Sequence, residues 1–339
     1  MRVSGQEGGA AGVWQWLVAV QRLRAVPAAY FHPTLDLAQA ARGLGCDSGL
    51  VEELVRAGFP ADETPEGLRF DYYDVMNLGL AAGLGRSLAE QYEQRCATMA
   101  TGTPEDWSAQ RSWRVRLGAP CTAPDCGGAI PAPPAPELLG GRLVEYQRSE
   151  RNPNDAIAVV LTRGRQEQPR TDLVRRIHDE LLTGLTTGRY QYSWLPDTLR
   201  LDPEAAAAHG MLDSGVAAWL MRRWALEAGL EVRTRKGYLL GLVGVEHAWA
   251  EVREQGRWLV LDPVLAFHAL RRTPGGTDAA AAFAAFCQGS VHNHLLAWPG
   301  AANEPFTEHQ CAAGGHIAYR CGRLPSATLA RPVASMAGV

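Results

Sequence analysis

The chain has 339 residues, of which 46% are hydrophobic and 20% are charged, and its net charge is −3. This composition is typical of a globular protein with a sizeable core, and the charge gives no general attraction to nucleic acid. No run of about 18 apolar residues is present, and no signal-peptide cleavage pattern follows residues 13–20. We therefore expect no membrane span and a cytoplasmic protein.

Seven cysteines are present, an odd number for a chain of this size. In a reducing compartment most of them should be free thiols. Neither the pair Cys121 and Cys126 nor the set Cys311, His316 and Cys321 has the two-residue gap that is common in zinc sites. We therefore expect no metal and no other cofactor.

Residues 1–117 are predicted to form a small helical module, with helices over 35–45 and 48–57 and with Ser48 as the N-cap of the second. The run AARGLGCDSGLVEELVRAGFP (residues 40–60) resembles the winged helix-turn-helix of the MerR and excisionase families. Between residues 33 and 95, however, eleven acidic residues stand against five basic ones. Duplex DNA is bound largely through basic side chains. We therefore predict a scaffold or partner-docking module that binds no nucleic acid.

Residues 118–141 are rich in proline and glycine, which block helix and central strand, and are predicted to be a linker. The main domain is expected over 142–310, with a strand at 156–161 and an amphipathic helix over 171–184 that Thr171 caps. The apolar face of this helix is predicted to comprise Leu173, Ile177, Leu181 and Leu182. The tail, 311–339, is predicted to consist of loops with a frayed end.

Another helix is predicted to begin at Ser214, within HGMLDSGVAAWL (residues 209–220), and to end at Gly229. Its apolar stripe is Ala217, Met221, Trp224, Ala225 and Ala228. Ser214 has two interpretations. It is an N-cap that contributes about 1 kcal/mol, or a nucleophile that the helix dipole and free backbone N–H groups assist. The second interpretation needs a base and a carboxylate nearby.

Three strands are expected after this helix, over 230–242, 245–252 and 258–264. Gln255 and Gly256 are predicted to form a two-residue turn with Gly256 at positive φ, which sets Glu254 opposite Arg257. This register places His247, Trp249, Asp262 and Val264 on one face of the sheet, with Asp262 diagonal to His247. The other face, predicted to be core, carries Ala248, Ala250 and Val252.

This order of residues resembles the transglutaminase-like superfamily, which has a papain-like fold. That family has a cysteine at a helix start, a strand that begins His-Ala-Trp, and an Asp-Pro about fifteen residues later. Here these positions are Ser214, then His247-Ala248-Trp249, then Asp262-Pro263. The resemblance implies an α+β fold, a helix packed on an antiparallel sheet, preceded by the winged-helix-like module.

The serine departs from the family pattern, because a serine does not ionise at neutral pH and must pass its proton to His247 as it attacks. Three interpretations stay open. The serine is natural and makes a Ser-His-Asp enzyme, it is an engineered replacement of a cysteine made to trap a substrate, or the site has degenerated.

For an intact site the resemblance implies acyl transfer, with Ser214 as nucleophile, His247 as general base and Asp262 orienting the imidazole. Backbone N–H groups at the helix start, Gly215 among them, are expected at the oxyanion. The indole of Trp194 either joins them or is an ordinary packing aromatic. Trp249 is expected in the substrate site. The product is an amide if an amine accepts the acyl group. A peptidase or amidase with the same triad is the alternative, as is an inactive protein that binds a substrate or partner.

Bacterial relatives in that superfamily include amide-forming enzymes of antibiotic assembly lines, which take acyl groups from carrier-protein thioesters. The resemblance thus implies an acyl thioester donor, an amine acceptor and a role in natural-product biosynthesis. Five basic residues of this chain either bind an acidic carrier protein or are ordinary solvated surface. They are Arg222, Arg223, Arg233, Arg235 and Lys236, the last being the sole lysine.

Overall fold

The computed structural model describes residues 9–118, 142–148, 155–240, 245–272, 278–298, 307–310, 316–319 and 326–332. The chain divides into two compact units, Met1–Thr98 with Gly188–Asp213, and Met99–Thr187 with Ser214–Val339. The fold is α+β, with helices packed on antiparallel sheets, as the sequence predicts. Within the described residues, no helix is long and apolar enough to span a bilayer.

In the first unit two consecutive helices, Leu37–Leu44 and Ser48–Arg56, are followed by a hairpin of the strands Asp62–Thr64 and Gly67–Asp71, and the resemblance to a winged helix stays a prediction. Asp47, not Ser48, caps the second of the paired helices, because its carboxylate accepts the N–H of Leu50 at 2.8 Å. A small sheet has the order β1-β3-β2. The elements are α1 (Gly9–Arg22), β1 (Pro33–Asp36), α2 (Leu37–Leu44), α3 (Ser48–Arg56), β2 (Asp62–Thr64), β3 (Gly67–Asp71) and α4 (Tyr72–Ala82).

Residues 188–213 belong to this first unit although they follow it by about ninety residues. The side chain of Arg24 ties them in, because it donates to the carbonyls of Gly210 at 2.8 Å and Gly188 at 3.0 Å. Helix α5 (Leu88–Met99) ends where the second unit starts. The returning segment carries β7 (Gln191–Tyr192), α8 (Asp197–Arg200), α9 (Pro203–Ala208) and β8 (Met211–Leu212), with β7 and β8 parallel.

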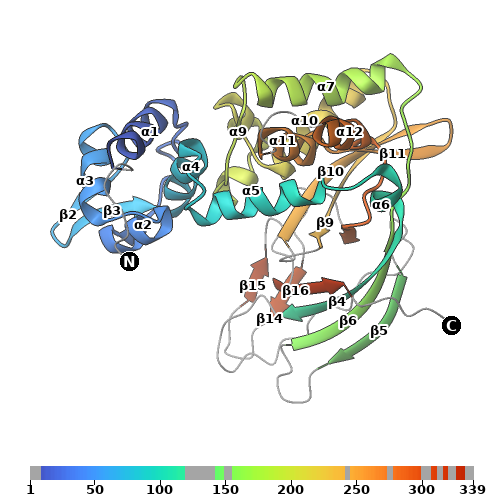
Figure 1. Cartoon of the computed structure of the whole chain (residues 1–339), viewed down its shortest axis with the longest axis horizontal. Helices are drawn as coiled ribbons and strands as arrows, with labels where there is room; N and C mark the ends of the chain where they lie inside the picture. Colours follow the sequence, from blue (N-terminus) through green and yellow to red (C-terminus); the bar gives the residue numbers. More distant parts are fainter. Residues whose placement is uncertain are drawn as a thin grey trace, which may run out of the picture. The chain divides into compact units, whose positions relative to one another are not determined.

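The second unit is built on a five-stranded antiparallel sheet of order β12-β11-β10-β9-β13. Helix α10 packs on β9 and β10, and α7 packs on α10 and α11 (Figure 1). These elements are α7 (Asp172–Thr186), α10 (Ser214–Glu227), β9 (Val232–Leu239), β10 (Val245–Glu254), β11 (Arg257–Leu261), α11 (Pro263–Arg272), α12 (Asp278–Phe286), β12 (Gln288–Gly289) and β13 (Leu295–Trp298).

A second sheet in this unit has the order β16-β4-β6-β5. Its strands are β4 (Gln110–Gly118), β5 (Arg142–Arg148), β6 (Asp155–Arg163) and β16 (Ser326–Pro332). Helix α6 (Pro104–Ser108) precedes it, and β14 (Thr307–Gln310) pairs with β15 (His316–Tyr319).

The division into units differs from the predicted one at both ends of the main domain. Strand β4 pairs with β6 along its whole length, so residues 99–118 lie with the second unit and not with the N-terminal module ending at 117. The tail predicted as loops contains β15 and β16, and β16 pairs with β4. Apart from Gly118 at the end of β4, the predicted linker lies outside the described residues.

Helix α7 forms where the sequence predicts it, but Thr171 does not cap it with its side chain. Instead the hydroxyl and the N–H of Thr171 both donate to Glu254, at 2.7 and 2.9 Å. Leu173 and Leu182 are only half buried. The buried face of the helix is shifted toward Val174, Ile177, Leu181 and Leu185.

Candidate active site

The hairpin of β10 and β11 has the predicted register. Gln255 and Gly256 have φ angles of 50° and 80°, and Glu254 lies opposite Arg257. Pairing continues to Ala250 opposite Leu261. Two consecutive positive φ angles are those of the type I′ turn that suits the twist of two strands, so local turn chemistry fixes which residues of β10 share a face.

Asp262 is the point at which β11 stops and a helix begins. The sequence predicts a strand through Val264, but the strand ends at Leu261 and Pro263 opens α11, so Val264 is helical and does not face His247. Proline suits the first helical position because it has no N–H to lose. The carboxylate of Asp262 caps the new helix, with Oδ1 accepting the N–H of Leu265 at 3.1 Å.

The other carboxylate oxygen of Asp262 binds His247. Oδ2 lies 2.7 Å from the imidazole Nε2, and both residues are 2% exposed. The backbone N–H of Asp262 donates to the carbonyl of Cys287 at 3.1 Å. The hydrogen bonds with Leu265 and Cys287 thus hold Asp262 in place, and its carboxylate sets the orientation of the His247 imidazole.

Ser214 lies beside the same strand. It is the first residue of α10, is 8% exposed, and its Oγ accepts the N–H of Ala248 at 3.2 Å. The hydroxyl therefore bonds to β10, and the N-cap interpretation does not describe it. In an antiparallel ladder, hydrogen-bonded pairs alternate with non-bonded ones, and Ala248 is the next bonded position after Ala250. Because the chain turns into α11 at Pro263, that N–H is left for Ser214.

The packing of α10 explains why Ser214 is held there. Ala217, Met221 and Ala225 of the predicted stripe are buried, whereas Trp224 is half buried and Ala228 is exposed beyond the helix end. Gly229 has a φ of 74° and ends the helix as predicted. A helix packed along one face has a fixed axis, so its first residue has a fixed position.

The hydroxyl of Ser214 therefore lies beside Ala248, the residue that follows His247 along β10, and His247 is bound by the Asp262 carboxylate. Because Nε2 of His247 faces Asp262, the favoured neutral tautomer carries its proton on Nε2. Nδ1 is then the basic nitrogen, which suits the general-base role. Gly215 lies in the first turn of α10, where N–H groups have no partner within the helix.

Trp249 does not line an open site as the sequence analysis expects. It is fully buried, and its indole N–H donates to Glu251 Oε1 at 3.2 Å. Its ring lies nearly parallel to the His247 imidazole, with 26° between the planes and 6.3 Å between centroids. Trp249 therefore supports the imidazole from within the sheet.

Trp194 belongs to the first unit. Its backbone N–H donates to Asn77 Oδ1 at 2.6 Å, and its carbonyl accepts from Asn77 Nδ2 at 2.9 Å. The ring contacts those of Tyr72 and Tyr92, with centroids 6.4 and 6.2 Å away. These are packing contacts, and a role at the oxyanion stays a prediction.

A charged cluster on the His247 face of the sheet escapes sequence analysis. Glu251 is fully buried, and its Oε2 lies 2.6 Å from Nε of Arg233 and 3.6 Å from Nε of Arg235. Strand register sets Arg233 opposite Glu251 and Arg235 opposite Trp249. The sequence does contain one indication of this cluster, because Arg233 and Arg235 alternate along the strand that precedes the one with Glu251. Without a short turn between β9 and β10, however, the sequence does not fix their register.

This cluster corrects the expected basic surface. Lys236 is fully buried and presents no charge to a partner protein. Arg233 is paired with Glu251, and Arg223 lies 3.8 Å from Glu227 on α10. Of the five basic residues proposed for carrier docking, only Arg222 is well exposed.

The described cysteines do not compete with Ser214. Cys46, Cys96 and Cys287 are not disulfide-bonded. Burial, and secondarily the charge of Asp262, holds the pKa of Cys287 well above its usual value, so its thiol stays protonated. Burial also raises the pKa of Cys46 to about 11.

No group of three His, Cys, Asp or Glu side chains is arranged for a metal ion anywhere in the described residues. Of the residues considered for zinc in the sequence, Cys121, Cys126, Cys311 and Cys321 lie outside them, and His316 is the first residue of β15.

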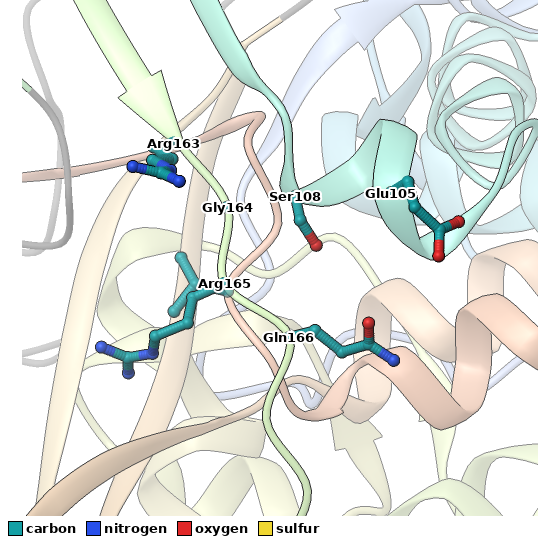
Figure 2. A pocket seen from close by; sticks show the side chains of 7 residues that line it. Glu105, Ser108, Arg163, Gly164, Arg165 and Gln166 are labelled. Carbon is teal, nitrogen blue, oxygen red and sulfur yellow. The ribbon is translucent and has the colours of Figure 1, made fainter.

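A cavity of about 550 Å³ lies elsewhere in the second unit, and no triad residue lines it. In Figure 2, Arg163 and Arg165 lie on one side of it and Glu105 and Gln166 on the other, with Ser108 between them. Arg165 donates to the carbonyl of Trp258, at the opposite end of β11 from Asp262. The cavity is therefore separate from the candidate active site.

Comparison with models of protein families gave no match, and comparison with curated proteins gave none either. Among solved structures, a protein described as a candidate cysteine protease from Cytophaga hutchinsonii is similar over 45% of this chain and 75% of its own, at 10% sequence identity and a TM-score of 0.23. A similarity of that size establishes neither a shared fold nor a shared activity, so the functional assignment rests on the residues of this chain.

Proposed function

We propose that the second unit catalyses acyl transfer through Ser214, His247 and Asp262. The observation that carries the proposal is the 2.7 Å contact between His247 Nε2 and Asp262 Oδ2, beside a hydroxyl bound to the N–H of Ala248. A buried His–Asp pair next to a hydroxyl at a helix start supplies base, orienter and nucleophile in one place.

In the first step Ser214 Oγ forms a bond to the carbonyl carbon of a thioester, ester or amide. Its proton moves to Nδ1 of His247, and the imidazolium that forms is stabilised by the Asp262 carboxylate. N–H groups in the first turn of α10, that of Gly215 included, stabilise the oxyanion. The carbon–sulfur, carbon–oxygen or carbon–nitrogen bond then breaks, and the leaving group takes the proton from His247.

In the second step an amine or a water molecule attacks the acyl-enzyme. His247 accepts the proton of the attacking group and returns it to Ser214 Oγ as the acyl–oxygen bond breaks. An amine gives an amide, and water gives an acid. We favour amide formation from an acyl thioester, in the cytoplasm and within natural-product biosynthesis, because the resemblance to transglutaminase-like enzymes supports it. Hydrolysis by the same triad is the second candidate.

Release of free thiol from acyl thioesters of N-acetylcysteamine tests the proposal. The full chain is expected to release thiol, S214A is not, and S214C should release it faster because a cysteine beside histidine ionises more readily. Adding a primary amine separates the two candidates, since a transferase forms more amide than acid. If wild type and S214C both match S214A with every donor, the proposal is wrong and a binding role is favoured.

A further inference from the structure

We infer that Arg235 forms an anion-binding subsite, which takes a negatively charged group of the acyl donor on the His247 face of the sheet. The inference rests on the proposed function, because it names the substrate class of that site. Nothing in the triad itself requires an anionic donor.

Strand register places Arg235 on that face. Trp249 lies directly opposite Arg235, and His247 lies opposite Gly237, two residues further along β9. Directly opposed residues share a face, and alternate residues of a strand return to it. Arg235, Trp249 and His247 therefore project from the same side of the sheet.

The charge of Arg235 is incompletely balanced. The nearby carboxylate of Glu251 is already bound at 2.6 Å by Arg233 and at 3.2 Å by the indole of Trp249, whereas Arg235 Nε stays 3.6 Å away. One carboxylate between two guanidinium groups leaves one net positive charge. Arg235 forms only the longer ion pair with Glu251, which Arg233 already binds. Positive charge that is held out of water and only partly balanced is costly, so the cluster favours an added anion.

The guanidinium of Arg235 is also placed to receive that anion. Its side chain is only 12% exposed. Within the described part of the chain, Nε is buried and makes no hydrogen bond. A guanidinium also carries Nη1 and Nη2, whose paired N–H donors match a carboxylate or phosphate.

Spacing along the sheet sets the length of the donor. Residues 247 and 251 lie on one strand at about 3.3 Å per residue, so the cluster begins about 7 Å from His247 and ends about 13 Å from it. The anionic group is therefore separated from the reacting carbonyl by several bonds. A medium-length dicarboxylic monothioester spans this distance, as does a thioester whose thiol part carries phosphate.

The test compares donors that differ in charge alone. The suberoyl monothioester of N-acetylcysteamine has a terminal carboxylate, and its terminal amide is the neutral match. An acyl group on coenzyme A, compared with the same group on pantetheine, tests phosphate on the thiol side. We expect wild type to prefer the charged member of at least one pair, and R235Q to lose about tenfold or more in kcat/KM for that member, mainly through KM.

Controls separate recognition from structure. R235Q should slow the charged donor about tenfold more than the neutral donor, and R235K should keep part of the preference. R253Q removes an equal charge from an exposed pair with Glu231 on the same face and should change nothing. If R235Q slows charged and neutral donors equally, or if wild type shows no preference in either pair, the inference is overturned.

If no donor is turned over and the proposed function fails, calorimetry still tests whether Arg235 binds an anion. Suberate and pyrophosphate are titrated into the full-length wild type and into R235Q. Binding of either anion to wild type that R235Q weakens about tenfold supports the subsite without catalysis. Equal binding to both proteins, or binding to neither, overturns it.

Discussion

Asp262 binds His247 with one carboxylate oxygen and caps α11 with the other. Oδ2 lies 2.7 Å from His247 Nε2, and Oδ1 accepts the N–H of Leu265 at 3.1 Å. One side chain therefore ties the candidate base to a helix start. The same interaction that begins α11 fixes the direction from which the imidazole is held.

This division of roles predicts the effect of D262N. An asparagine that keeps its oxygen on the helix N–H turns its NH₂ toward His247, so Nε2 must accept and Nδ1 carries the proton. The imidazole then cannot take the proton of Ser214, and kcat should fall by on the order of 10³–10⁴-fold.

Stability distinguishes this effect from misfolding. D262N keeps the cap and should unfold at nearly the wild-type denaturant midpoint, whereas D262A also loses the cap, which contributes about 1 kcal/mol. Thiol release and urea unfolding of both variants provide the measurement. A D262N protein with wild-type kcat would refute the assigned role of Asp262.

Gly237 predicts a stability effect at the strand position opposite His247. A Cβ there would lie 2.1 Å from the carbonyl oxygen of Leu296 and 2.8 Å from Cα of Ala297. Because both are backbone atoms of the neighbouring β13, the strands must separate, and G237A should cost several kcal/mol.

The matched control for Gly237 is G256A, at the hairpin turn. Gly256 has a φ of 80° with nothing within 4 Å of an added Cβ, so only backbone strain of about 1 kcal/mol is expected. Free energies of unfolding from urea titrations compare the two variants. If G237A and G256A lose the same free energy of unfolding, the backbone of β13 is not in close contact with Gly237 of β9.

Asp74 predicts a pH dependence of stability in the first unit. Its side chain is fully buried, Oδ1 accepts the N–H of Val26 at 2.7 Å, and Oδ2 has no hydrogen-bond partner in the described residues. Burial raises the pKa of Asp74 to about 7. Because the folded state holds this proton more tightly, its contribution to stability is full below the unfolded pKa, near 4, and is lost as pH rises to about 7.

The variant D74N removes this titration and keeps an uncharged side chain of the same shape. Relative to wild type, D74N should gain up to about 3 kcal/mol in free energy of unfolding between pH 5 and pH 8. Denaturant titrations at both pH values, followed by circular dichroism, measure the difference. Parallel pH profiles for the two proteins would show that Asp74 is ionised throughout.

The winged-helix-like module is predicted not to bind DNA. In α3, Val51 and Leu54 are buried and Glu52 and Glu53 are exposed, so the second helix of the pair presents negative charge outward. Like charges repel the phosphate backbone. Filter binding of random duplex DNA at low salt should show no retention, and retention that falls with added salt would contradict this.

The features that sequence analysis predicted correctly depend on local chemistry. The register of the β10–β11 hairpin follows from a two-residue turn, and the length of α10 follows from its apolar spacing and Gly229. The pairing of Ser214 with the N–H of Ala248 did not follow, because it depends on where β11 stops. That point is set by Asp262 and Pro263 starting a helix instead of extending the strand.

The missed features are non-local. The return of residues 188–213 to the first unit depends on Arg24 and on Asn77, which hydrogen-bonds the backbone of Trp194, and no periodicity in the sequence indicates these contacts. Strand β16 pairs with β4 across about two hundred residues. The burial of Lys236, the sole lysine, was not predicted, because β9 carries polar side chains on both faces and its sequence does not show which face is buried.

Mapping of the acylated residue tests the central claim most directly. The full chain is incubated with an acyl thioester of N-acetylcysteamine, quenched in acid, and examined by intact-mass and peptide mass spectrometry, with S214A and H247A beside it. We predict one added acyl mass on the peptide that contains Ser214, absent from S214A and strongly reduced in H247A. Acylation that persists in S214A, or that maps to a cysteine such as Cys287, would contradict the account.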